Sequence, residues 1–253
     1  MDIKTETKGK VVVVTLDRPP VNTLLLETYQ GIADTFYAIG MREDVHCAVF
    51  TAAGSRAFCA GLDLVEFTSA RIEDDPARAA VVRNCFSSIR NCSIPVIGAI
   101  NGPAIGAGCV LASVCDIRLA SENARFGLTE VNVGRCGGTA HMARHIPQAV
   151  LRRMFFTGEP ISAVEAQQHS FVDRVVPLEE LMPAALELAG RIASKAPLGL
   201  RMGKAALNET EFLSVEDGYA HEQRYSTRLM ATEDAREAAR AVLEKRSPVF
   251  VGR

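Results

Sequence analysis

The order of apolar and polar residues predicts strands and helices that alternate over the first two thirds of the chain. Five short apolar runs, of which the first is rich in β-branched residues, predict strands: residues 11–19, 48–51, 94–100, 114–120 and 172–176. Apolar residues recur at helical spacing over 23–39, and 79–91 is a second predicted helix. The polar stretch 68–78, which contains Pro76, predicts a mobile surface loop.

The pattern changes after Val176, because the rest of the chain contains four helical stretches and no convincing strand. Upstream of this point, Ser162 and Glu165 have the spacing of a capping box, which predicts the start of a helix. The alternating front and the helical tail together predict an α/β core over residues 1–190, followed by a helical C-terminal region over residues 191–253 of the same domain.

Composition and charge narrow the class of protein. The chain has 253 residues, 48% of them hydrophobic and 23% charged, which is typical of a globular protein with a sizeable core. Its 28 Lys and Arg residues against 30 Asp and Glu argue against a nucleic-acid partner. No apolar run approaches the roughly 20 residues of a membrane helix. Residues 1–10 lack the apolar core of a signal peptide, so we expect a cytoplasmic protein with no membrane partner.

Cysteine and histidine patterns give little support to metal or nucleophilic chemistry. The seven cysteines form no C-x-x-C pair, and we expect them to be buried, reduced thiols. His141 and His145 are spaced like zinc ligands, but the stretch HMARH lacks the glutamate beside the first histidine. We therefore expect ordinary histidines on a helix surface and no metal. No G-x-S-x-G nucleophile motif is present.

The stretch INGPAIGAGCVLASVCD, residues 100–116, carries the chain from a predicted strand through a glycine-rich bend into a helix-like run. Such a bend presents backbone N–H groups at a helix start, where a negative group can bind. It is not a dinucleotide fingerprint, because Gly106 and Gly108 are followed by no third glycine at the required spacing. It is not a P-loop either, because no G-K-[ST] follows.

Three segments in the same order and spacing identify a resemblance: AFCAGLDL at 57–64, the glycine bend with its continuation to residue 134, and EKRSPVF at 244–250. The chain resembles the enoyl-CoA hydratase/isomerase family, also called the crotonase family, over essentially its whole length. The resemblance implies a crotonase-like spiral of ββα units with a helical C-terminal trimerisation region. It also implies an acyl-CoA substrate, no cofactor beyond the CoA of that substrate, and a homotrimer or dimer of trimers.

The resemblance further implies a catalytic set. The backbone N–H groups of Leu62 and Ala107 would bind the negative oxygen of an enolate, and Glu130 would be the acid/base. Where family hydratases carry a first glutamate, this chain has Val110. Hydration of an enoyl-CoA divides its work between two carboxylates, whereas shifting a double bond needs one proton carrier. Both reactions stay open at this point. An acyl-CoA-binding protein with degenerate catalysis, or another crotonase reaction such as decarboxylation or hydrolysis of a thioester or C–C bond, is the alternative.

The remaining residues implied to contact the substrate or its CoA are Ala60, Gly61, Asp63, Leu64, Gly106, Gly108, Val110, Arg135 and Lys245. The loop after Glu130 is shorter than in most relatives, so that Arg135 and Cys136 come near the site. For Arg135 two interpretations are open: it orders a water or an acidic acyl group, or it points to solvent. Lys245 either approaches the CoA, across a subunit boundary, or is a solvated residue at a helix end. Residues 65–92 are expected to shape the acyl pocket.

Overall fold

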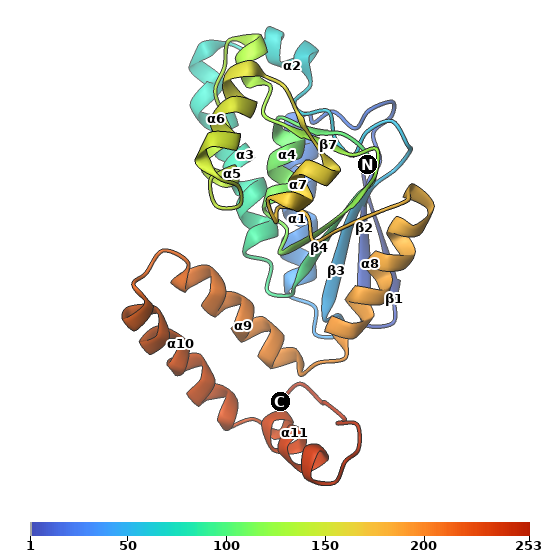
Figure 1. The fold of residues 1–253 in the computed structure, drawn as a ribbon, viewed down its shortest axis with the longest axis vertical. Coiled ribbons are helices and arrows are strands. Elements are labelled where there is room, and N and C mark those ends of the chain that lie inside the picture. Colours follow the sequence, from blue (N-terminus) through green and yellow to red (C-terminus); the bar gives the residue numbers. More distant parts are fainter. Residues whose placement is uncertain (1) are drawn as a thin grey trace.

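The computed structural model describes residues 2–253 and is built on two sheets (Figure 1). The larger sheet has the order β1-β2-β3-β4-β6-β9, with β1 Ile3–Lys8, β2 Val11–Leu16, β3 Cys47–Ala52, β4 Val96–Ile100, β6 Ile117–Ser121 and β9 Arg174–Val176. Strand β1 is antiparallel to β2, and the other neighbours are parallel. The smaller sheet pairs β5 (Ala104–Ile105), β7 (Arg125–Gly127) and β8 (Ile161–Ser162).

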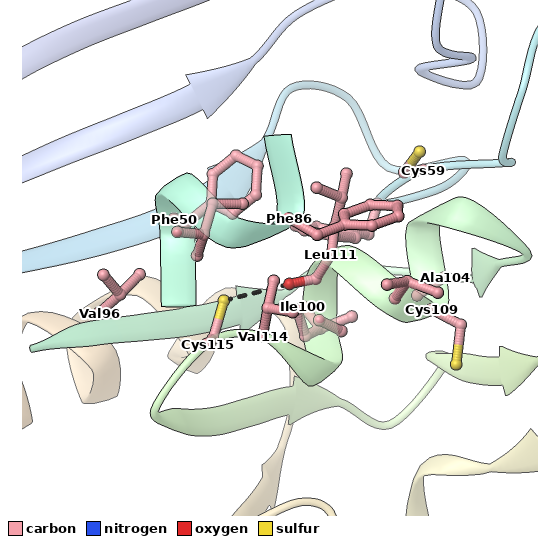
Figure 2. Close-up of a cluster of buried hydrophobic side chains, with 14 of the residues drawn as sticks. Phe50, Cys59, Phe86, Val96, Ile100, Ala104, Cys109, Leu111, Val114 and Cys115 are labelled. Atoms are coloured by element: carbon pink, nitrogen blue, oxygen red, sulfur yellow. Dashed lines mark hydrogen bonds between the residues drawn. The ribbon is translucent and has the colours of Figure 1, made fainter. Parts of the chain in front are cut away.

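Parallel strands are buried on both faces, which explains the unbroken run of valines in β2. Val12 and Val14 pack into the core on one face, where α1 (Leu26–Gly40), α3 (Asp75–Arg90) and α4 (Ala107–Ser113) lie. Figure 2 shows Phe50, Phe86 and Leu111 in that core. Val11 and Val13 face the other way, against α8 (Leu178–Ala193). Leucine and alanine at four-residue spacing along α8 form the covering stripe: Leu181, Ala185, Ala189 and Ala193.

The other helices are α2 (Leu64–Ser69), α5 (Thr139–Met142), α6 (Gln148–Thr157), α7 (Ala163–Gln168), α9 (Pro197–Thr210), α10 (Val215–Met230) and α11 (Glu233–Leu243), with short 3-10 turns at Ile72–Asp74 and Glu130–Val133. Helices α9, α10 and α11 extend away from the sheets at the opposite end of the molecule from α2 (Figure 1). The four helices after Val176 match the expectation. The expected boundary at residue 190 falls in the last turn of α8 and stays a prediction.

Several predicted elements are confirmed, and the misses have local causes. The predicted strands and helices are present, and the Ser162 hydroxyl caps α7 by accepting from the Glu165 N–H at 3.0 Å. The segment 68–78 was wrongly expected to be a loop: it contains the end of α2, a 3-10 turn and the first turn of α3. Pro76 lies in that first helical turn, where its missing N–H costs nothing. Strand β1 was missed because it is an exposed, polar edge strand.

The histidine and cysteine expectations also need correction. Helix α5 ends at Met142, so His145 lies in the following turn, where its Nε2 is 2.8 Å from the Ser113 carbonyl oxygen. Burial, the largest cause, and the nearby Arg118 lower the pKa of His145 to about 4, so the ring is neutral. Six cysteines are buried and free, as expected, whereas Cys136 is exposed. No cluster of metal-ligating side chains occurs within residues 2–253.

One buried lysine fastens the C-terminal region to the core. Lys204 of α9 is 5% exposed, and its Nζ donates to Asp116 Oδ2 at 2.7 Å and to the Ile94 carbonyl at 3.1 Å. The same Asp116 oxygen accepts from the Val96 N–H at 2.7 Å, at the start of β4. These bonds connect α9 to the entry of the central strands.

We expect Lys204→Met to lower the free energy of unfolding by about 2 kcal/mol, because it removes the charged donor to the partly exposed Asp116 and to the Ile94 carbonyl. Urea unfolding at one fixed protein concentration measures the change. Lys195→Met is the control, since Lys195 is exposed and the described residues give it no ion-pair partner. Equal stability of the two variants would contradict the role given to Lys204.

Candidate active site

Two backbone bridges hold the segment 57–64 between the start of α1 and the glycine bend. Leu62 is bridged in parallel to Leu24, through bonds from the Leu24 N–H to Gly61 O at 2.8 Å and from the Asp63 N–H to Leu24 O at 3.0 Å. Cys59 is bridged to Ala104, and the Ile105 N–H donates to Cys59 O at 2.9 Å. The two loops named in the sequence are therefore fixed side by side by their main chains.

This arrangement leaves two backbone N–H groups unpaired. In a parallel bridge the residues before and after the central one make the bonds, so the N–H of Leu62 points away from Leu24. Ala107 is the first residue of α4, and the first N–H groups of a helix have no partner inside it. Within residues 2–253 neither N–H has a hydrogen-bond partner. A Cβ placed on Gly61 would lie 3.7 Å from the Ala107 nitrogen, which shows how close the two loops are.

Glycine is required at two positions of the bend for different reasons. Gly106 has φ +54°, which favours glycine, and it is the N-cap residue of α4. A Cβ on Gly108 would lie 2.2 Å from Cys59 O, so only glycine lets α4 approach this closely. Ala107 between them does not have positive φ. Alanine therefore presents its N–H at this position without strain.

The Glu130 carboxyl lies beside these groups. Its Oε1 is 3.3 Å from where a Cβ on Gly106 would be, and its Oε2 is buried without a hydrogen-bond partner in the described chain. Burial raises the pKa of this carboxyl above its ordinary value. The main chain closes around it, because the Arg135 N–H donates to Glu130 O at 2.9 Å. A half-buried acid with an unused oxygen is thus available to a ligand.

Two cavities meet at these residues. The larger, of about 440 Å³, lies between α1, α2, α3, the start of α4 and residues 135–138. The smaller, of about 360 Å³, is lined by residues 60–65 and by the turn that contains Glu130. Leu62, Ala107 and Glu130 line both. The two free N–H groups and the carboxyl therefore lie at the junction, where an extended ligand would place its centre.

Among the acids that line the two cavities in the described chain, Glu130 alone has a side chain without a partner. Glu66 accepts from Arg78 at 2.9 Å, and Asp75 pairs with Arg135 at 3.1 Å. Asp63 caps α2 and pairs with Arg18 at 3.1 Å. The chemistry available at the junction is consequently one carboxyl group and two N–H donors.

Val110 is 2% exposed and contributes an alkyl wall to the larger cavity. It faces the bend at Gly138, since a Cβ on that glycine would lie 2.8 Å from Val110 Cγ2. Val110 is therefore packed against the site.

The other predicted site residues divide into three groups. Ala60, Gly61, Asp63, Leu64 and Gly106 line the smaller cavity. Arg135 lies on the wall of the larger cavity, with its guanidinium 5.0 Å from the centre of the Phe67 ring, so it does not simply point to solvent. Cys136 lines the same wall. Gly108 lines neither cavity, because it is buried against Cys59. Lys245 is exposed and follows α11, a helix at the opposite end of the molecule from α2 (Figure 1).

Individual residues of the larger cavity were not predicted, although the segment 65–92 was expected to shape a pocket. One face of α3 lines the cavity at helical spacing: Asp75, Arg78, Ala79, Val82, Arg83 and Phe86. From α1, Leu26 and Tyr29 join them. The 3.6-residue period within 75–86 was the available signal, and the misassigned loop concealed it.

Comparisons with known proteins identify the family and the fold. Residues 6–253 match the enoyl-CoA hydratase/isomerase family. A short-chain-enoyl-CoA hydratase from Clostridium acetobutylicum is 35% identical over 245 residues, covering 95% of this chain and 94% of that protein. A carnitinyl-CoA dehydratase from Proteus mirabilis is 35% identical over 254 residues, covering 98% and 97%. The crystal structure of an enoyl-CoA hydratase from Bacillus anthracis is 31% identical, covers 100% of both chains and superimposes with a TM-score of 0.96. The expected fold is confirmed.

Proposed function

The chain belongs to the enoyl-CoA hydratase/isomerase family, which acts on acyl-CoA thioesters, and from that premise we propose that its site moves a proton at C2 of the substrate by way of an enolate. Glu130 is the acid/base of this proposal. The observation that carries it is the junction of the two cavities, where the unpaired carboxyl lies beside the unpaired N–H groups of Leu62 and Ala107.

The two N–H groups would stabilise the negative charge of the intermediate. When a proton leaves C2, or a nucleophile adds to C3 of a 2-enoyl thioester, charge develops on the thioester oxygen. Fixed donors aimed at that oxygen need no reorganisation during the reaction, and each contributes about 10²- to 10³-fold to the rate. The bridges at Leu24 and Ala104 supply the rigidity that this role requires.

The two cavities suit the two arms of an acyl-CoA. The larger one has apolar walls from Phe67, Val82 and Phe86, which suits an acyl chain. The smaller one is bordered by the loop 60–65, and we assign the pantetheine arm of CoA to it. The thioester would then lie at the junction, next to Glu130.

Two reactions of this enolate are compatible with one carboxyl group. Shifting a double bond needs a single proton carrier, and the alkyl wall at Val110 favours it. Addition or removal of water also proceeds if Glu130 both takes a proton from water and delivers it to C2, and the named hydratase and dehydratase relatives favour this reaction. The ratio of hydration to isomerisation with crotonyl-CoA and 3-butenoyl-CoA distinguishes the two. Binding of both thioesters without turnover would contradict the proposal.

Val110→Glu is expected to raise the ratio of hydration to isomerisation several-fold, because it restores a second carboxylate beside the acyl arm. Two close carboxyl groups repel, which raises one pKa and suits a general acid. The measurement is the product ratio from 2-enoyl- and 3-enoyl-CoA at matched concentrations.

Val110→Gln is the control for this substitution, since it fills the same space without an ionisable group. Because Val110 packs tightly against Gly138, we expect both variants to lose stability to a similar extent. An unchanged product ratio in Val110→Glu, with thioester binding retained, would contradict the role given to Val110.

We also propose self-association through the C-terminal helices. Large apolar side chains are exposed along α9, α10 and α11 and in the adjoining turns: Leu207, Phe212, Leu213, Val215, Tyr219, Met230, Val242 and Leu243. A trimer or dimer of trimers would cover them. Contact between Lys245 and CoA would require such an assembly, because Lys245 lines neither cavity of its own chain.

A further inference from the structure

A tyrosine hydroxyl in the larger cavity has no assigned role. Tyr29 of α1 is 4% exposed and lines the cavity, with its ring edge-on to Phe86 at a centroid distance of 6.1 Å. Within residues 2–253 no hydrogen bond joins its Oη to the protein, and this atom is not among the fully buried polar atoms, so it is accessible from the cavity. The ring is therefore held by apolar packing, while its one polar atom remains unused.

A hydroxyl that opens into a cavity and has no partner in the protein is expected to find one in the cavity contents, a ligand or a bound water. Apolar side chains surround the space nearby, among them Leu24, Phe86 and Val110. Charged side chains also line this cavity, but Arg78 pairs with Glu66 and Arg135 pairs with Asp75. Tyr29 therefore adds a neutral polar contact that no described side chain uses. The contact suits one oxygen atom of a ligand or of a water bound with it.

The environment keeps this hydroxyl protonated. Burial, the largest cause, and the neighbouring groups Cys59, Cys85 and Glu130 raise the pKa of Tyr29 well above its ordinary value. The phenol is therefore unsuited to act as a base near neutral pH. It retains both hydrogen-bonding functions of a neutral hydroxyl, as donor and as acceptor.

We propose that Tyr29 positions the oxygen at C3 of the acyl group, namely the water that adds to a 2-enoyl-CoA or the hydroxyl that leaves a 3-hydroxyacyl-CoA. This inference rests on the proposed function. In this proposal Tyr29 of α1 orients the water, because Val110 in the same cavity wall offers no polar contact. Hydration is then the principal reaction of the site.

The step balances without a proton change at Tyr29. One O–H of the water donates to Glu130 and the other to Tyr29 Oη, which directs the oxygen lone pair at C3. As the C3–O bond forms, the first proton passes to Glu130 and the electron pair of C2=C3 moves to the thioester oxygen. Glu130 then delivers that proton to C2, the enolate collapses to the thioester, and the carboxylate is restored.

The test is Tyr29→Phe, which removes only the hydroxyl and keeps the contact with Phe86. We expect the kcat for hydration of crotonyl-CoA to fall about 10-fold or more, with little change in KM. Exchange of the C2 protons of butyryl-CoA with D₂O, followed by mass spectrometry, should remain within about twofold of wild type. That exchange needs Glu130 and the two N–H groups but involves no oxygen at C3.

Tyr37→Phe is the matched control, because Tyr37 lies on the same helix, is exposed, and donates to Asn84 outside the cavity. Unchanged hydration in Tyr29→Phe, or an equal fall of hydration and exchange, overturns the inference. A wild-type protein that exchanges C2 protons but adds no water also overturns it. Absence of exchange in wild type overturns the proposed function, and the inference with it.

Discussion

Glu130→Gln is expected to lower turnover of enoyl-CoA substrates by about 10²- to 10⁴-fold, while the affinity for a CoA thioester stays nearly unchanged. The amide keeps the shape of the carboxyl group but cannot carry a proton. Glu130 has no salt bridge, and its Oε2 has no hydrogen-bond partner in the described chain, so the substitution breaks no side-chain contact in the fold. Kinetics with a 2-enoyl-CoA, together with calorimetric titration of a saturated acyl-CoA, measure the two quantities separately.

Glu122→Gln is the control, because Glu122 is exposed and lines neither cavity. The pH dependence gives a second readout. Burial raises the pKa of Glu130, so the ionised base is lost as pH falls through a value above its ordinary 4.5. The acid limb of the wild-type rate profile should therefore lie above that value and disappear from the residual activity of Glu130→Gln. Retention of the wild-type rate and profile in Glu130→Gln would contradict the single-carboxyl mechanism.

The sequence is most informative at positions where the local backbone geometry or packing permits only one residue type. Gly106 needs positive φ and Gly108 needs the absence of a side chain, and both demands arise within a bend of a few residues. The N–H of Ala107 follows from its place at a helix start. These features were predictable because the segment 57–64 and the glycine bend are each continuous in the chain. Their pairing through Cys59 and Ala104 needed the resemblance to a family, because no periodicity reports contacts between distant segments.

The cavity walls were less predictable because their residues come from helices whose other faces are buried. Tyr29 lies in a helix of ordinary amphipathic pattern, and nothing in that pattern separates a tyrosine in the core from one that borders a cavity. Arg135 left two interpretations open, because its direction depends on a pairing with Asp75 that lies 60 positions earlier in the chain. The sequence could therefore predict the proposed reacting centre in more detail than the cavity wall around it.

Ala107→Pro is expected to lower the rate by at least about 10²-fold, because it removes one of the two N–H donors at the junction. Proline suits the first position of a helix, where the missing N–H breaks no helical bond. The preceding residue is Gly106, whose wide backbone freedom eases the restriction that proline places on its neighbour. The substitution therefore tests the donor more than the fold.

Ala107→Gly is the matched control, since it keeps the N–H and should retain most of the activity. Circular dichroism and acyl-CoA titration establish that both variants fold and bind. If the N–H acts on the enolate rather than on the bound thioester, the loss appears in kcat, and C2 proton exchange falls by the same factor as hydration. This pattern differs from that expected for Tyr29→Phe, in which the rate of hydration falls while the rate of C2 proton exchange stays nearly unchanged. A proline variant that binds acyl-CoA and keeps more than about a tenth of wild-type exchange would place the negative oxygen elsewhere.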